Sequence, residues 1–131
     1  MRSSTQQIAE LAYDCVLKVK GTDFEEKYKS YAKKLPSMVN FNGLLTTFAF
    51  MKSKSQGDSK EKRAYKTLLE HSVEFFNKIA QKQDWSYENL IKNLSELEFS
   101  EYRLLTVRFL EFAIWLKRIA EGELGGEDEG E

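Results

Sequence analysis

Residues 33–54, KKLPSMVNFNGLLTTFAFMKSK, restrict the fold more than any other part of the chain. This segment holds the single proline, Pro36, followed by a dense apolar run that Gly43 interrupts. The residue before a proline avoids the helical region, whereas proline itself fits the first position of a helix. The pattern therefore predicts that one helix ends near Leu35 and that a central helix begins at Pro36. Gly43 inside that helix costs about 1 kcal/mol relative to alanine, which the close approach of a neighbouring helix would justify.

The rest of the chain has the spacing of amphipathic helices. Apolar residues recur at intervals of three and four almost throughout, and sustained alternation is scarce. At 131 residues the chain is expected to form one domain. We therefore predict an all-α fold, a compact bundle of about six helices within a single domain over residues 1–121. The expected helices span roughly 4–20, 22–35, 36–51, 59–81, 86–97 and 100–121.

Small polar residues before several apolar runs fit helix caps. Thr22 with Glu25 matches a capping box, and Asp58 or Ser59, Ser86 and Ser100 precede later helices. In the first helix the apolar face includes Cys15, which we interpret as a small buried residue because a single cysteine cannot form an internal disulfide.

Charge is distributed unevenly along the chain. Six of the 21 acids lie between Glu121 and Glu131, where there is no lysine or arginine, so the body keeps 15 acids against 20 bases. Residues 122–131, GELGGEDEGE, are acidic and rich in glycine, and we expect this tail to be disordered. It could shield a basic surface from unsuitable anions, or it could serve only as a solubilising end.

Sequence signatures of an enzyme are absent. The single histidine, His71, lies off the expected apolar stripe of its helix and is predicted to be a surface residue. One cysteine and one histidine do not provide a zinc site of the usual ligand count, and nothing in the spacing supports Cys15 and His71 as nucleophile and base. There is no glycine-rich phosphate loop and no GxSxG motif. We expect no catalytic residues, metal or cofactor, although a site formed between protomers stays open.

The sequence also carries expectations about location. The N-terminus, MRSSTQQIAE, is polar and unlike a secretory signal. No apolar run approaches the roughly 20 residues that span a bilayer. We predict a cytoplasmic protein with no membrane partner.

Basic residues indicate a possible partner. Lysines crowd the second expected helix, and a second group follows the central helix: Lys52, Lys54, Lys60, Lys62, Arg63 and Lys66. Such groups attract backbone phosphates without sequence preference, but lysine-rich solvated helices are also common. No RNP motif or recognition helix indicates base-specific reading.

The last expected helix is apolar on two sides. Leu105, Phe109, Phe112, Leu116 and Ile119 form one stripe, and Val107, Leu110 and Ile114 project from the opposite side. A helix of this kind is either enclosed by its own domain or meets a partner. Arg103, Lys117 and Arg118 flank the second stripe, which would suit another subunit or a phosphate backbone.

Three segments together resemble a known family. They are LPSMVNFNGLLTTFAFMKSK, AYKTLLEHSVEFF, and EYRLLTVRFLEFAIWLKRIAEG. The first is similar to a Leu-Pro turn and an Asn-Gly-Leu helix that ends in Ala-Phe and a lysine. The last is similar to a closing helix with Tyr-Arg and Trp-Leu-Lys-Arg. In this order and over residues 8–122, they resemble the small helical subunit of the type III-B CRISPR RNA-silencing complex, the Cmr effector.

The resemblance implies a non-catalytic subunit that stacks in several copies beside the subunits holding the guide RNA. The chain would then line the groove where target RNA pairs with the guide, and its partners would be other Cmr subunits, copies of itself, and both RNAs. Cleavage would belong to the other subunits. The alternative from the residues is a helical adaptor that binds only protein, with no nucleic-acid role.

Site candidates follow from charge and from the resemblance. The interface candidates are Val107, Leu110 and Ile114. Arg118 could instead form an ion pair with Glu111 or the tail. Lys52, Lys117 and Arg118 lie in the family-like segments, and the other candidates rest on local charge. The candidates for RNA-backbone contacts are Lys52, Lys54, Arg63, Arg103, Lys117 and Arg118.

Overall fold

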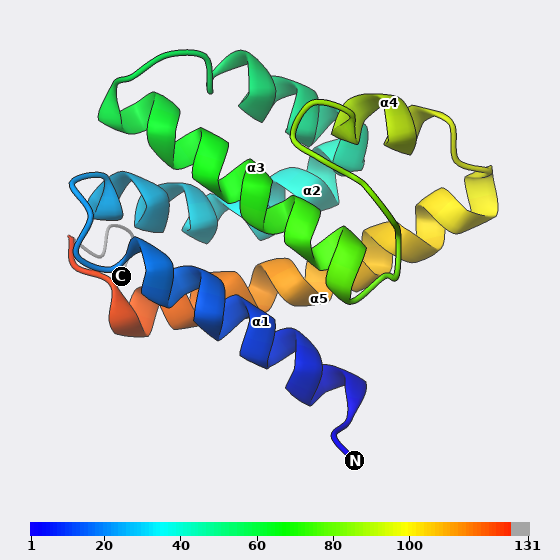
Figure 1. Cartoon of the computed structure of the whole chain (residues 1–131), viewed down its shortest axis with the longest axis horizontal. Coiled ribbons are helices and arrows are strands. Elements are labelled where there is room, and N and C mark those ends of the chain that lie inside the picture. The colour runs from blue at the N-terminus through cyan, green and yellow to red at the C-terminus, as the bar shows by residue number, and fades with distance from the viewer. Residues whose placement is uncertain (127–131) are drawn as a thin grey trace.

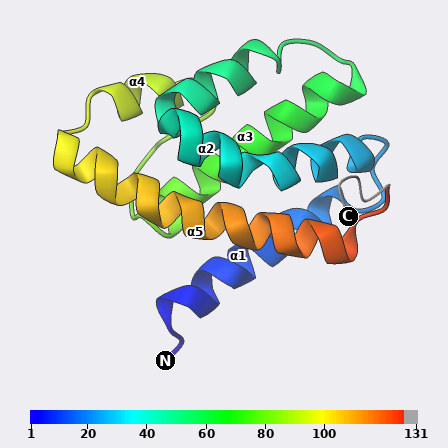
Figure 2. The same ribbon diagram turned by 180° about the vertical axis from the view of Figure 1, so that it is seen from behind.

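The computed structural model describes residues 1–126, and over these residues it is helical with no strand (Figure 1). The all-α prediction is confirmed, with five helices where about six were expected. α5 runs along the molecule with α2 on one side and α1 on the other, as Figure 2 shows from behind. α3 and α4 pack on α2. The helices are α1 (Ser4–Val19), α2 (Glu25–Ser53), α3 (Lys60–Lys78), α4 (Leu90–Ser95) and α5 (Phe99–Glu123).

The predicted break before the proline is wrong, because α2 continues through Pro36. A proline inside a helix removes one hydrogen bond and costs about 3 kcal/mol. The compensation is a continuous buried stripe on both sides of the proline, formed by Tyr28, Ala32, Leu35 and Val39. At about 1.5–3 kcal/mol for each large apolar side chain, burial of that stripe outweighs the loss.

The helical path breaks instead at Gly43, which has φ +81° and ψ 169°. That combination is essentially restricted to glycine, so the residue is required for its backbone and not for a close helix contact. Just beyond it, the Leu45 N–H donates to the Tyr102 hydroxyl at 3.0 Å, which ties the break to α5. The break also shifts the buried face. Phe41, just before the break, is 84% exposed, whereas Leu44 and Phe48 beyond it are buried.

Of the four expected caps only Ser59 caps a helix, because α4 begins after Asn89 with no side-chain cap. Ser59 accepts from the Lys62 N–H at the start of α3, as predicted. Ser86 exchanges backbone-to-side-chain bonds with Asn89 just before α4. Thr22 does not cap α2, because its hydroxyl donates back to the Val19 carbonyl. Ser100 lies inside α5 rather than at its cap.

Five phenylalanines form the centre of the core: Phe48, Phe75, Phe76, Phe109 and Phe112. Phe48 meets Phe109 edge to face at 5.2 Å between ring centroids, and Phe75 stacks on Phe112 at 5.1 Å. Such pairs add about 0.5–1.5 kcal/mol beyond the burial of their area. The rings therefore join α2, α3 and α5 into one core, and Cys15 from α1 is buried as predicted.

The C-terminal end of α5 is tied to the turn between α1 and α2. The Glu25 carboxylate accepts from Gly125 N–H at 2.6 Å and from Gly21 N–H at 2.9 Å, and these bonds lower its pKa. α5 continues through Glu123, and Leu124 is buried. Disorder was predicted for the whole of residues 122–131, but these contacts order the first part of that tail, and residues 127–131 lie outside the described residues. Among the described helices, none has the length and apolar content needed to span a membrane.

Candidate nucleic-acid and subunit interface

The basic candidates occupy three separate elements. Lys52 and Lys54 lie at the end of α2, and Arg63 is in the first turns of α3. The other three, Arg103, Lys117 and Arg118, belong to α5, where the 14 residues between the first two amount to about 21 Å along the axis. The structure therefore does not gather the six candidates into one cluster.

Lys52 is committed to contacts within the chain. Its ammonium donates to the Tyr87 carbonyl at 2.7 Å and to the Glu88 carbonyl at 3.3 Å, and it lies 4.5 Å from the centroid of the Tyr87 ring. Lys66 approaches the same ring at 5.3 Å. Sequence reasoning missed Tyr87, because the link between the end of α2 and the segment before α4 is visible only in the fold.

Arg63 lies at the surface but is likewise committed to contacts within the chain. Its two terminal nitrogens each lie 2.8 Å from one oxygen of Asp23, and its Nε donates to the Asp58 carbonyl at 3.0 Å. The bond from Arg63 is the main reason that the pKa of Asp23 lies below its ordinary value. Because the guanidinium charge is matched by a bidentate carboxylate, less of it is available to a phosphate.

Of the remaining four basic candidates, three are exposed and one is half-buried. Lys54 and Arg103 are exposed, and each lies beside a phenylalanine ring, at 5.7 Å and 5.6 Å respectively. Arg118 is 67% exposed and lies 3.7 Å from Glu121, whereas Glu111 accepts from Thr5 instead. Lys117 is half-buried on the same helix. These side chains keep the reach that a backbone contact needs.

An apolar stripe covers the outward side of α5. Val107 is 67% exposed and Ile114 is 47% exposed, whereas Leu110 is half-buried against the core. Phe99 and Leu104 extend the stripe toward the start of the helix, and Leu104 and Val107 line a surface hollow together with Ser100 and Arg103. The interface role of Val107, Leu110 and Ile114 stays a prediction.

The predicted surface position of His71 is wrong, because the side chain is only 5% exposed. Its Nδ1 lies 2.7 Å from the Tyr28 hydroxyl on α2. Burial lowers the pKa of His71 to about 4, with nearby Glu74 acting against this shift and Lys18 adding to it. The sequence did contain the signal, since Ala64, Leu68, His71 and Phe75 follow helical spacing on one buried face.

These observations define a small all-α protein with exposed apolar residues along α5 and exposed basic residues on α5 and at the end of α2. A family model described as CRISPR-associated protein (Cas_Cmr5) matches residues 4–123. The chain therefore belongs to the Cas_Cmr5 family, which confirms the resemblance seen in its sequence.

Individual relatives agree with this family over nearly the whole chain. A protein of Thermotoga maritima named CRISPR system Cmr subunit Cmr5 is 32% identical over 128 residues, covering 98% of this chain and 90% of the relative. A protein of the same name from Thermus thermophilus is 31% identical over 92% of this chain and 96% of the relative. The crystal structure of a CRISPR-associated Cmr5 family protein, also from Thermus thermophilus, matches with a TM-score of 0.75 at 28% identity, covering 94% of this chain and 98% of that one.

Proposed function

We propose that this chain is a non-catalytic small subunit of a CRISPR Cmr effector complex. Several copies stack in the complex, and basic side chains line the groove that holds guide and target RNA. The observation that carries the proposal is the family match over residues 4–123, supported by two relatives that are named Cmr subunits. The cytoplasmic location predicted from the sequence belongs to the same proposal.

The outward stripe of α5 supports the stacking part. Stacked copies need two different surfaces on each chain, because a head-to-tail contact joins unlike patches. Exposed apolar side chains grouped on one helix, as Val107 and Ile114 are with Leu104, are a suitable candidate for one of these surfaces. The half-buried Leu110 contributes less to an outward contact.

Stacking is tested with the double variant Val107→Asp and Ile114→Asp in the reconstituted complex. We expect fewer copies of the chain per complex by native mass spectrometry, with the helical circular dichroism of the free chain unchanged. Leu17→Asp on α1 is the matched control, because Leu17 is also an exposed aliphatic side chain but lies outside the stripe. An unchanged copy number in the double variant contradicts this surface.

The RNA part rests on the basic side chains that project. Sequence-independent grip on a duplex needs lysine and arginine aimed at phosphates. Lys54, Arg103, Lys117 and Arg118 keep reach for such contacts, whereas the ammonium of Lys52 and the guanidinium of Arg63 are bonded within the chain. We therefore assign most of the proposed RNA contact to Lys54, Arg103, Lys117 and Arg118, and less of it to Lys52 and Arg63.

Glutamine at Lys54, Arg103, Lys117 and Arg118 together tests this assignment in the assembled complex. We expect weaker retention of target RNA and a flatter dependence of affinity on salt, with a slope lower by roughly one for each phosphate that is no longer neutralised. Lys92→Gln is the control, because Lys92 is an exposed lysine that lies 3.4 Å from Glu96 on α4. Unchanged retention in an intact complex contradicts the RNA role.

The second candidate function is a helical adaptor that contacts only protein. The internal bonds of Lys52 and Arg63 favour it, because they remove two of the six basic candidates from easy contact with RNA. The two functions separate in the experiments above. An adaptor loses assembly when the apolar stripe is changed and keeps RNA retention when the basic residues are neutralised.

A further inference from the structure

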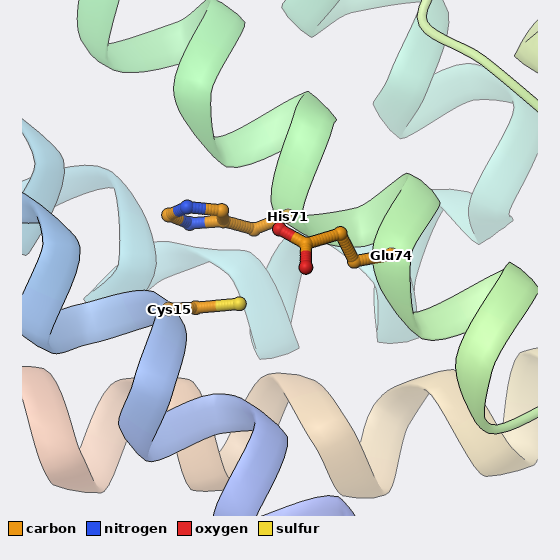
Figure 3. Close-up of side chains that lie close together, drawn as sticks. All are labelled: Cys15, His71 and Glu74. Carbon is orange, nitrogen blue, oxygen red and sulfur yellow. The ribbon is translucent and has the colours of Figure 1, made fainter.

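Cys15, His71 and Glu74 meet between α1 and α3, as Figure 3 shows. The sulfur, one imidazole nitrogen and one carboxylate oxygen all lie within 4.8 Å of one another. His71 and Glu74 are three residues apart on α3 and so lie on one side of that helix, and α1 supplies the cysteine. The proposed RNA and stacking surfaces use none of these side chains.

The three groups form a donor set of mixed chemistry in a mostly buried place. Cys15 and His71 are buried, while the Glu74 side chain is about one quarter exposed at 27%. The carboxylate is thus the one of the three groups that reaches solvent. Tyr28 from α2 lies 2.7 Å from Nδ1 of His71 and fixes the orientation of the ring. Neighbouring hydrogen bonds of this kind orient the histidines that bind metals.

We propose that Cys15, His71 and Glu74 form a binding site for a single zinc ion, which would join α1 to α3. Sulfur with nitrogen favours zinc over magnesium or calcium, which select oxygen donors. A thiolate and a carboxylate neutralise the two positive charges of the ion, so the loaded site buries no net charge. Binding transfers the thiol proton of Cys15 to solvent as the sulfur–metal bond forms. A water completes the four positions.

The geometry requires only a small adjustment. Bonds of about 2.0–2.3 Å from a tetrahedral ion place its donors roughly 3.5 Å apart, so separations of up to 4.8 Å must close by at most about 1.3 Å. Glu74 has the long, partly exposed side chain that can supply this movement. One of its oxygens already accepts from Lys78 at 2.9 Å, which leaves the second oxygen for the ion. The sequence-based prediction of no zinc site considered only cysteine and histidine as ligands. It did not consider a carboxylate such as that of Glu74.

The test uses the full chain without a polyhistidine tag, stripped of metal with a chelator. Cobalt(II) is added as a spectroscopic probe, and zinc is then added in competition. We expect one equivalent of cobalt to produce a thiolate-to-cobalt charge-transfer band that zinc abolishes. Because the chain has one cysteine, that band reports Cys15 alone. We also expect zinc, but not magnesium, to raise the unfolding temperature by several degrees.

Variants separate the site from adventitious binding. Cys15→Ser should remove the charge-transfer band, His71→Gln should abolish tight zinc binding, and Glu74→Gln should weaken it at least tenfold. Glu70→Gln is the matched control, because Glu70 is an exposed glutamate on the same helix. The absence of the band in the wild-type chain overturns the proposal, as does zinc binding that survives in Cys15→Ser. If a buried variant fails to fold, the wild-type spectrum and Glu74→Gln decide.

Discussion

The two faces of α5 have similar side chains and opposite surroundings. On the inner face Phe109, Phe112 and Leu116 have no measurable exposure, whereas on the outer face Val107 is two thirds exposed. Both sets are apolar, so composition alone does not distinguish the residues that stabilise the chain from those available to a partner. Burial does, because apolar surface contributes to folding only when it leaves water. The comparison can be tested by changing one face at a time.

The largest effect is expected at the inner face. Phe109→Ala should lower the free energy of unfolding by about 4 kcal/mol, because it leaves a cavity among four other phenylalanine rings. Chemical denaturation of the free chain measures this loss. Val107→Ala should stay within about 0.5 kcal/mol of wild type. If the two variants cost the same, the outer face is covered within the chain and the comparison fails.

The next largest effect is the acid sensitivity that buried His71 gives to the stability of the chain. His71 is neutral when buried, and burial lowers its pKa from 6.5 to about 4. The unfolded chain therefore binds a proton more readily, so stability is highest above pH 6.5 and falls as the pH drops from 6.5 toward 4. The full loss is about 3 kcal/mol. Urea unfolding across this range, with a chelator present, measures it.

A matched variant isolates the histidine from other groups. Titratable and charged neighbours of His71 include Tyr28, Cys15, Lys18 and Glu74, and Glu74 also titrates at acid pH. His71→Gln removes the imidazole and keeps these neighbours. Its stability should change less between pH 6.5 and 4 than that of the wild type. An equally steep loss in His71→Gln assigns the acid sensitivity to another group.

A smaller effect is expected where α2 breaks beside α5. At Gly43 an added Cβ would lie 3.6 Å from the Tyr102 hydroxyl, an ordinary contact, so the cost of Gly43→Ala comes from the positive φ. We expect a loss of about 2 kcal/mol. Gly122→Ala is the opposite case, because Gly122 lies within α5 in open space. It should stabilise the chain by about 0.5–1 kcal/mol. Thermal unfolding of both variants checks that one destabilises the chain and the other stabilises it. A stabilising effect of Gly43→Ala contradicts the positive φ at this residue.

The sequence predicted the features that depend on local pattern. Apolar spacing predicted the all-α fold, and Ser59 was recognised as a cap because a cap depends on residues only three apart. The caps expected at Thr22 and Ser100 from the same local rule are absent, whereas the failure at Pro36 involves contacts between helices. The break was predicted at Pro36 because the local rule for proline is strong, but packing of Leu35 and Val39 outweighed it.

The site was less predictable for the same reason. Arg63 carries a charge in a basic stretch, so its sequence surroundings favour a phosphate contact. Its partner Asp23 lies 40 residues earlier and meets it only when α3 packs beside the start of α2. Lys52 similarly finds its carbonyl partners 35 and 36 residues later. Sequence reasoning located the charges correctly and could not determine which of them fold back on the chain.

The smallest effect is expected at this surface ion pair, and it tests which arginines are available to RNA. Both side chains are more than one third exposed, so Arg63→Gln should change stability little, and less at high salt. It should raise the pKa of Asp23 toward its ordinary value, because the bond from Arg63 is the main cause of its lowering. Nuclear magnetic resonance titration of the carboxyl measures this change.

Arg118→Gln is the control, because Arg118 projects from α5 and should leave Asp23 unaffected. If the pKa of Asp23 does not move in Arg63→Gln, the bidentate pair does not persist in solution. Arg63 would then be available for RNA contact in the same way as Lys54, Arg103 and Arg118. Lys52 would be the one remaining basic candidate whose charge is held by bonds within the described part of the chain.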